Sequence, residues 1–190
     1  MVSRRSRILG YFRLLLMYLL VGWLAWMSRP TRATFLLGLP LVVVGESIRF
    51  WAAGHLLKSK ELVTSGPYTY MQNPLYLGRV LIYTGFCLMA WLPPYGWNLL
   101  VLAAGLAVFF RYYIPRKVRV EGARLAAHHG AAWEAYHRAM PILFPRLTPY
   151  PGAVAAPWRS ERMRRNKEWA MALGVGLVTL FFAWKAFPPA

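Results

Sequence analysis

Acidic residues are scarce in this sequence, and charged residues in general are fewer than a soluble protein normally carries. Only 15% of the 190 residues are charged, and just six of these are acidic against 23 Lys and Arg. Soluble domains carry about 25% charged and about 45–50% apolar residues, whereas 58% of this chain is hydrophobic. The polar surface is too small to enclose a soluble bundle of buried helices, so the composition favours a membrane protein.

Cysteine and histidine are also too few for two common kinds of stabilising site. Cys87 is the only cysteine, which excludes a disulfide within the chain. The histidines lack a recognisable metal-ligand spacing; they are His55, His128, His129 and His137. We therefore expect no metal site.

Long hydrophobic runs are the main positive signal. Five runs approach the roughly 17–25 residues that a membrane-spanning helix needs; they cover about 8–27, 35–57, 75–91, 97–113 and 169–187. The sequence thus predicts an all-α, polytopic integral membrane protein with about five transmembrane helices in a single domain, 1–190. The first run follows a basic start, as in a signal peptide, but it is long and Trp-rich and has no small-residue cleavage site. We expect a retained helix there.

The excess positive charge is distributed unevenly between the connections. Lys and Arg precede the first run, follow the second, and fill the region 111–167, whereas the opposite connections hold only Arg29, Arg32 and Lys185. This alternation is the positive-inside pattern and predicts a cytoplasmic N-terminus and an outer C-terminus, in a bacterial inner membrane rather than the endoplasmic reticulum. The net charge of +17 is then a topology signal and a contact with anionic lipids, and we expect no nucleic-acid partner.

The segment 66–78 has a structural and a functional interpretation. Gly66-Pro67 is typical of a turn, and Asn73-Pro74 fits the cap and first position of a helix. The nearby tyrosines Tyr68, Tyr70 and Tyr76 are explained in part by an interfacial aromatic belt. Alternatively, the helix N-terminus binds a carboxylate or phosphate of a ligand.

Two other groups of charged residues also allow two interpretations. Glu46 and Arg49 lie one turn apart inside the second apolar run, where they form either a neutralised pair that fixes helix packing or the wall of a polar pocket. Glu121 ends the basic stretch that starts at Arg116. It either relieves repulsion among its neighbours or holds ribose hydroxyls or an amino group beside a basic substrate clamp.

Two segments resemble a known family when taken together. The first is ELVTSGPYTYMQNPLYLG; the second follows a helix hairpin and reads E-x-x-x-L-x-x-x-H-G-x-x-W-x-x-Y. They resemble the isoprenylcysteine carboxyl methyltransferase family, within a wider group that includes phospholipid N-methyltransferases. The matching residues are Gly66, Pro67, Tyr68, Tyr70, Pro74, Tyr76, Gly78, Glu121, Leu125, Gly130, Tyr136 and Pro141. The family's Arg-His is Gln72-Asn73 here, its second Glu is Gly122, and its Phe-Gly is His129-Gly130.

The resemblance implies a metal-free, S-adenosylmethionine-dependent methyltransferase that acts on a lipid or a lipidated molecule. Its partners would be membrane lipids and a lipophilic methyl acceptor, and its cofactor would lie in a cytoplasmic helical region, about 58–74 and 114–147. The implied cofactor-binding residues are Tyr68, Tyr70, Gln72, Asn73, Pro74, Tyr76, Gly78, Glu121, Trp133 and Tyr136. Arg116 and Arg119 are the expected catalytic residues, close to the acceptor.

Three alternatives stay open. Phospholipid methyltransferases tend to carry Asn-Pro where this chain has Asn73-Pro74, which favours N-methylation of a phospholipid. Membrane sterol reductases share a related Pro-x-Tyr signature, so reduction with NADPH is a second alternative. The replacement of Arg-His by Gln72-Asn73 would favour a non-catalytic membrane scaffold.

A reporter enzyme fused after Ala190 tests the predicted topology. Because the charge asymmetry places that end outside, a reporter that works only on the non-cytoplasmic side should be active there. Activity of a cytoplasmic reporter at the same position would contradict the five-span topology.

Overall fold

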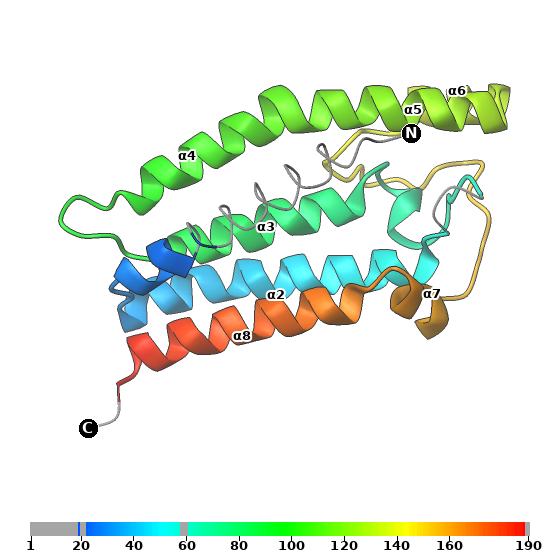
Figure 1. Ribbon diagram of the computed structural model, residues 1–190. Coiled ribbons are helices and arrows are strands. Elements are labelled where there is room, and N and C mark those ends of the chain that lie inside the picture. Colours follow the sequence, from blue (N-terminus) through cyan, green and yellow to red (C-terminus); the bar gives the residue numbers. More distant parts are fainter. Residues whose placement is uncertain (1–18, 20–21, 58–60, 189–190) are drawn as a thin grey trace, which may run out of the picture.

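The computed structural model describes residues 19, 22–57 and 61–188, and the predicted all-α fold is confirmed there (Figure 1). No strand occurs among the described residues. In chain order the elements are α2 (Arg32–His55), η1 (Gly66–Thr69), α3 (Pro74–Met89), α4 (Asn98–Val108), η2 (Phe109–Tyr113), α5 (Ile114–His129), α6 (Ala131–Ala139), α7 (Ser160–Arg165) and α8 (Glu168–Ala186). Of these, η1 is a 3₁₀ turn and η2 is a π-helical turn.

Helices α2, α3 and α8 lie side by side and enclose the apolar core (Figure 1). Its buried members are Phe35, Val42, Ile82, Met89, Val175, Phe182 and Ala186. Other leucines and valines of the same helices, such as Leu37 on α2 and Leu177 on α8, point outward and are exposed. Apolar side chains on both faces of a helix are expected for helices whose outer face contacts lipid.

Glycines allow α2 and α3 to pack with their backbones almost in contact. Gly38 and Gly45 of α2 face Gly85 and Gly78 of α3. A Cβ atom on Gly85 would lie 2.7 Å from the Gly38 carbonyl oxygen, and one on Gly78 would lie 2.6 Å from that of Gly45. Small residues at a fixed spacing are the usual way in which membrane helices approach closely. The two pairs therefore fix the position of α3 on α2.

Four of the five predicted spans appear as helices. Three helices are long and apolar enough to cross a membrane: α2, the continuous helix Asn98–His129, and α8. Helix α3 has 16 residues and is the shorter one. The first predicted span, 8–27, lies outside the described residues except at 19 and 22–27, which are helical.

The fourth predicted span continues beyond its expected end at 113. Helix α4, the π-helical turn η2 and helix α5 form one continuous helix, Asn98–His129, of 32 residues. Pro115 near the start of α5 has no N–H to donate. The π-helical turn ends two residues before it, and such turns occur mostly as single turns inside α-helices. The continuous helix ends at Gly130, which has φ 47° and separates α5 from α6.

The C-terminal end of α2 is closed by residues more than a hundred positions away. The indole nitrogen of Trp158 donates to the Phe50 carbonyl (3.0 Å), and the Asn166 amide donates to the carbonyls of Ala53 (3.2 Å) and Leu56 (3.1 Å). The last carbonyls of a helix have no partner within it. The region 141–158, which has no regular secondary structure, thus returns to α2 before α7 and α8 begin.

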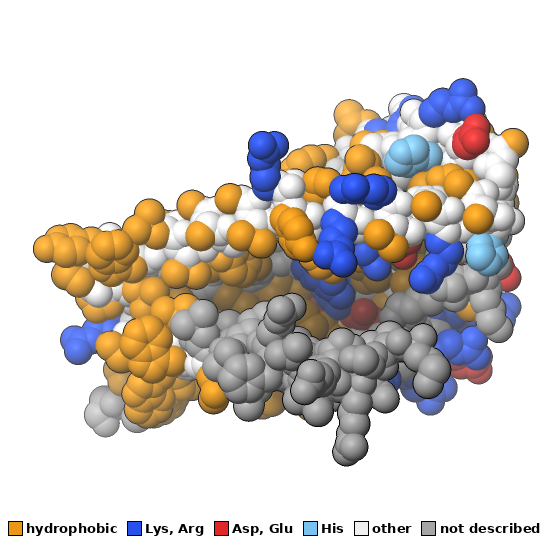
Figure 2. Space-filling model, turned by 45° about the horizontal axis from the view of Figure 1, so that its top comes forward, with side chains coloured by type: hydrophobic (Ala, Val, Ile, Leu, Met, Phe, Trp, Pro, Cys, Tyr) orange, Lys and Arg blue, Asp and Glu red, His pale blue; other side chains and the backbone are white. Residues whose placement is uncertain are grey.

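Lipid-facing and basic surfaces occupy opposite ends of the molecule. Figure 2 shows hydrophobic side chains along α4, whereas Lys and Arg gather at the other end, over α5 and α6. Exposed apolar residues on α4 include Leu99, Leu100 and Val108. This separation is that of an integral membrane protein whose basic end lies outside the hydrocarbon layer.

The glycine contacts between α2 and α3 can be tested by adding a single methyl group. Gly85→Ala should lower the free energy of unfolding by about 1–3 kcal/mol, because overpacking forces the helices apart. Gly174→Ala on α8 is the matched control, since a Cβ there meets nothing within 4 Å among the described residues. Thermal unfolding in detergent compares the two; equal midpoints would show that the close approach is not needed.

Candidate functional site

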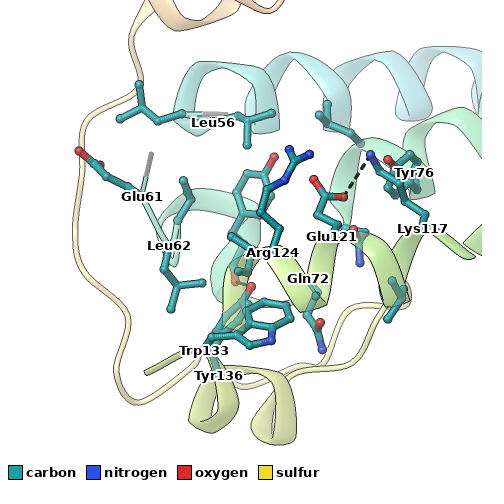
Figure 3. Close-up of a pocket in the computed structure, with 18 of the residues that line it drawn as sticks. Leu56, Glu61, Leu62, Gln72, Tyr76, Lys117, Glu121, Arg124, Trp133 and Tyr136 are labelled. Carbon is teal, nitrogen blue, oxygen red and sulfur yellow. Dashed lines mark hydrogen bonds and ion pairs between the residues drawn. The ribbon is translucent and has the colours of Figure 1, made fainter. Parts of the chain in front are cut away.

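A cavity of about 400 Å³ lies at the basic end, between the start of α3 and helices α5 and α6 (Figure 3). Both segments that carry the family resemblance contribute to its wall. Seven of the ten predicted cofactor-binding residues line it: Tyr68, Gln72, Asn73, Tyr76, Glu121, Trp133 and Tyr136. The fold thus brings residues about 65 positions apart in sequence to one site, for example Tyr68 and Tyr136, which share a hydrogen bond.

Tyr136 ties α6 to the turn η1. Its buried hydroxyl donates to the carbonyls of Tyr68 (2.7 Å) and Met71 (3.2 Å). Burial raises the pKa of both Tyr68 and Tyr136 above the usual range of a phenol. Both hydroxyls therefore stay protonated at neutral pH, and that of Tyr136 is a neutral donor.

Gln72 forms the second link between the same two segments. Its amide nitrogen donates to the carbonyls of His137 (3.3 Å) and Met140, and its amide oxygen lies 2.8 Å from His137 Nδ1. The backbone N–H of Gln72 donates to the Pro141 carbonyl (2.9 Å). A buried side-chain amide whose nitrogen and oxygen are both hydrogen-bonded fixes the segments around it in one arrangement. Gln72 therefore anchors the end of α6 on the segment before α3.

Asn73 occupies the predicted cap position of α3 but does not cap it with its side chain. The Asn73 amide instead donates to the Ile142 carbonyl (3.0 Å), and no side-chain bond to the first turn of α3 is formed. Pro74 takes the first helical position, as predicted. The pair Gln72-Asn73, which replaces the family's Arg-His, thus joins the motif segment to the chain after α6.

Helix α5 contributes the charged side of the cavity. Figure 3 shows Glu121 and Arg124 pointing into the space, with Lys117 beside Glu121. Lys117 Nζ lies 3.3 Å from Glu121 Oε2, and the Glu121 side chain remains 46% exposed. The Glu121 carboxylate thus has free surface for a ligand in addition to its pair with Lys117.

An aromatic wall completes the cavity on the side of α6. Trp133 is buried and stacks on His137, with ring centroids 5.0 Å apart. Tyr136 packs edge-on against Tyr150 at 5.2 Å. Neighbours thus fix the indole of Trp133 in place, and its ring also lines the cavity. A fixed aromatic ring suits a flat ligand ring.

Three predicted cofactor-binding residues lie outside the lining. Tyr70 packs toward Trp51, with ring centroids 6.5 Å apart. Pro74 is buried at the start of α3, and Gly78 contacts Gly45 of α2. For these three residues, packing accounts for the position, and their cofactor contacts stay a prediction.

The two predicted catalytic arginines are also outside the lining. Arg116 and Arg119 are exposed on α5, and Arg116 Nη1 donates to the Tyr112 hydroxyl at 2.7 Å. The cationic residues that line the cavity are Arg79, Lys117 and Arg124. A catalytic role for Arg116 and Arg119 remains untested.

Glu168 is the main residue of the site that the sequence reasoning missed. It is the first residue of α8 and lines the cavity, and its Oε2 lies 2.5 Å from Nη2 of the fully buried Arg49. The expected partner of Arg49, Glu46, lies farther away, at 3.8 Å. The only available signal was the position of Glu168, an acidic residue directly before the last apolar run.

The lining suits an organic ligand of moderate size. Ligand pockets measure about 300–1,000 Å³, and this cavity offers carboxylates for hydroxyl or amino donors beside a fixed indole. Among the residues that the structure describes, no group of three or more His, Cys, Asp or Glu side chains could hold a metal ion.

The chain is similar in sequence to one protein family and to two metal-resistance proteins. A sequence model described as "Phospholipid methyltransferase" matches residues 31–121. The "Cobalt-zinc-cadmium resistance protein CzcN" of Cupriavidus metallidurans is 31% identical over 155 residues, which cover 79% of this chain and 67% of that protein. The "Nickel-cobalt-cadmium resistance protein NccN" of Alcaligenes xylosoxydans xylosoxydans is 32% identical over 125 residues, 65% of this chain and 54% of that protein. No solved structure matches the chain.

Removal of a single oxygen atom tests the link between α6 and η1. Tyr136→Phe should lower the free energy of unfolding by about 1–3 kcal/mol, because two buried carbonyls lose their donor. Tyr112→Phe removes the same atom at an exposed position and should have almost no effect. Thermal unfolding of both variants in detergent checks this; an equal loss, or none, would argue against the anchoring role.

Proposed function

Because the chain belongs to the phospholipid methyltransferase family, we propose that it transfers a methyl group from S-adenosylmethionine to a lipid or lipidated acceptor. The membership confirms the resemblance predicted from sequence at the level of this wider membrane group. The proposal includes two kinds of acceptor. One is a carboxylate, as in the isoprenylcysteine enzymes, and the other is a phospholipid amine.

One observation carries the proposal. The motif before α3 and the motif on α5 and α6 line one cavity at the basic end of a membrane protein, with Tyr76 from the first and Glu121 and Trp133 from the second. A water-soluble cofactor and an apolar acceptor can meet only where such a cavity adjoins the bilayer.

The residues present fit the proposed cofactor. Glu121 would accept hydrogen bonds from its amino group or its ribose hydroxyls, and the Trp133 indole would pack against its adenine. When bound, the cofactor supplies an electrophilic methyl group, so the protein mainly has to align the acceptor. Tyr68 and Tyr136, held neutral by burial, would keep the cavity wall in one arrangement. Arg116 and Arg119 remain proposed catalytic residues on the acceptor side.

The orientation in the membrane is part of the same proposal. The basic end, with α5 and α6, would face the cytoplasm, where the cofactor is available. The C-terminal end of α8, at the opposite end of the molecule in Figure 1, would face outward. A bacterial inner membrane, with the N-terminus in the cytoplasm, is the proposed location.

The names of the relatives suggest a setting for this activity. Both are called resistance proteins, for cobalt, zinc and cadmium in one case and nickel, cobalt and cadmium in the other. The chain spans 67% and 54% of their lengths. We propose that methylation of a membrane component by this chain serves resistance to divalent metal ions.

Glu121→Gln is the sharpest test of the cofactor assignment. Loss of a charge-assisted hydrogen bond, worth roughly 1.5–3 kcal/mol, should weaken S-adenosylhomocysteine binding about ten- to a hundred-fold. Glu134→Gln is the matched control, because Glu134 forms the same kind of i,i+4 pair, with Arg138 at 3.3 Å, but does not line the cavity. Calorimetric titration in detergent measures both variants.

The outcomes separate the proposal from its alternatives. Unchanged affinity in Glu121→Gln would return Glu121 to charge relief on a solvated basic helix. Saturable NADPH binding without S-adenosylhomocysteine binding by the wild type would favour the reductase. No binding of either would favour a scaffold that kept the fold.

A further inference from the structure

Arg79 belongs to the cavity wall but lies beyond the residues proposed to hold the cofactor. It is the sixth residue of α3, about 7.5 Å along the helix axis from Pro74, and the helix carries it toward the bilayer. An arginine inside an apolar membrane helix is costly unless it meets a partner or a wet cavity, and it is a functional candidate by default. Its place in the lining makes it part of a wet cavity.

Two tyrosines hold the Arg79 side chain in place without neutralising it. Its Nη1 donates to the Tyr113 hydroxyl at 3.3 Å, and its guanidinium carbon lies 5.2 Å from the centre of the Tyr76 ring. The two rings pack edge-on at 5.7 Å. Aromatic faces attract a cation and orient it, but they carry no formal charge.

Arg79 differs from its neighbour Lys117 in how its charge is paired within the described residues. Lys117 is paired with Glu121 at 3.3 Å. Within the described part of the chain, no carboxylate oxygen lies within 4.0 Å of Arg79, since the ion pairs there involve Arg49, Lys117 and Arg138. Most of its N–H donors are therefore available at the membrane side of the cavity.

We propose that Arg79 binds an anionic oxygen group, a carboxylate or a phosphate, on the amphiphilic methyl acceptor. The planar guanidinium presents paired donors that match either group in a bidentate manner. The identification of the ligand as a methyl acceptor rests on the proposed methyl transfer, whereas the preference of Arg79 for an anionic group does not. Arg79 thus selects anionic or zwitterionic amphiphiles over neutral lipids.

The apolar part of such a ligand has a place beside Arg79. Figure 1 shows α4 running beside α3 from the short connection that joins them toward the basic end, and α4 exposes apolar side chains such as Leu100 and Val108. Tyr113, which ends η2, bridges the helices at this end through its bond to Arg79. An alkyl chain lying along α3 and α4 would keep its charged head at the guanidinium.

A simpler interpretation is that Arg79 only extends to the membrane surface. Long cationic side chains near helix ends do so without binding anything specific. That interpretation predicts no preference between lipids with the same chain and different heads, so ligand binding separates the two.

Three probes with one oleoyl chain provide the test, in an uncharged maltoside detergent with the full chain. Oleate carries a carboxylate, oleoyl lysophosphatidylethanolamine carries a phosphate, and monoolein is neutral. Wild-type protein should bind at least one of the two probes with an anionic oxygen group about tenfold or more tightly than monoolein, as expected for a charge-assisted contact. Arg79→Gln should abolish that preference. Arg111→Gln removes an exposed arginine of η2, two residues before Tyr113 and outside the lining, and should retain it.

Each result decides the question. Preference for oleate alone identifies a carboxylate acceptor, and preference for the lysolipid alone identifies a phosphate. Equal affinity for all three probes, or a preference that survives in Arg79→Gln, overturns the proposal. Arg79→Lys serves if the Gln variant does not fold, and it should weaken the preference because an ammonium group lacks the planar fork. S-adenosylhomocysteine binding is titrated in parallel, so failure of the proposed methyl transfer shows separately.

Discussion

The close contact between α2 and α3 is the constraint on which the rest of the structure depends. Glycines opposite one another let the two backbones nearly touch, and this fixes where the first turn of α3 lies. Arg49 of α2 can then donate to the Leu75 carbonyl (3.3 Å) and reach Glu168 (2.5 Å). The segment before α3 is positioned in the same way, and with it the floor of the cavity.

Much of the fold could be predicted because membrane helices leave a local signal. Runs of apolar residues predicted the spans that correspond to α2, α3, α4 and α8. The continuity of α4 with α5 was missed, since the polarity changes near 113 while the backbone continues as a helix. A change in composition marks where a helix leaves the bilayer, and this need not be where the helix ends.

The site was predictable only where its residues form motifs. Tyr68, Tyr76, Glu121, Trp133 and Tyr136 came from two such motifs and line one cavity. Glu168 and Arg79 also line it, but neither belongs to a motif: Glu168 is brought in by Arg49, 119 positions away, and Arg79 by the direction of α3. The role of Gln72 was also hidden, because its partners at His137 and Met140 are defined only by folding. Where the family has arginine, this chain therefore has a glutamine that anchors the end of α6.

The continuous helix Asn98–His129 has a mechanical consequence. At about 1.5 Å per residue it is about 48 Å long, well beyond a hydrocarbon layer of about 30 Å. Its apolar part lies in lipid, whereas its far part carries Lys117 and Glu121 of the cavity wall. Helices respond to a thinner or thicker bilayer by changing their tilt, and a stiff rod transmits that tilt to both ends. A change of tilt would therefore move Lys117 and Glu121 relative to the rest of the cavity wall, which would couple the shape of the cavity to the thickness of the membrane.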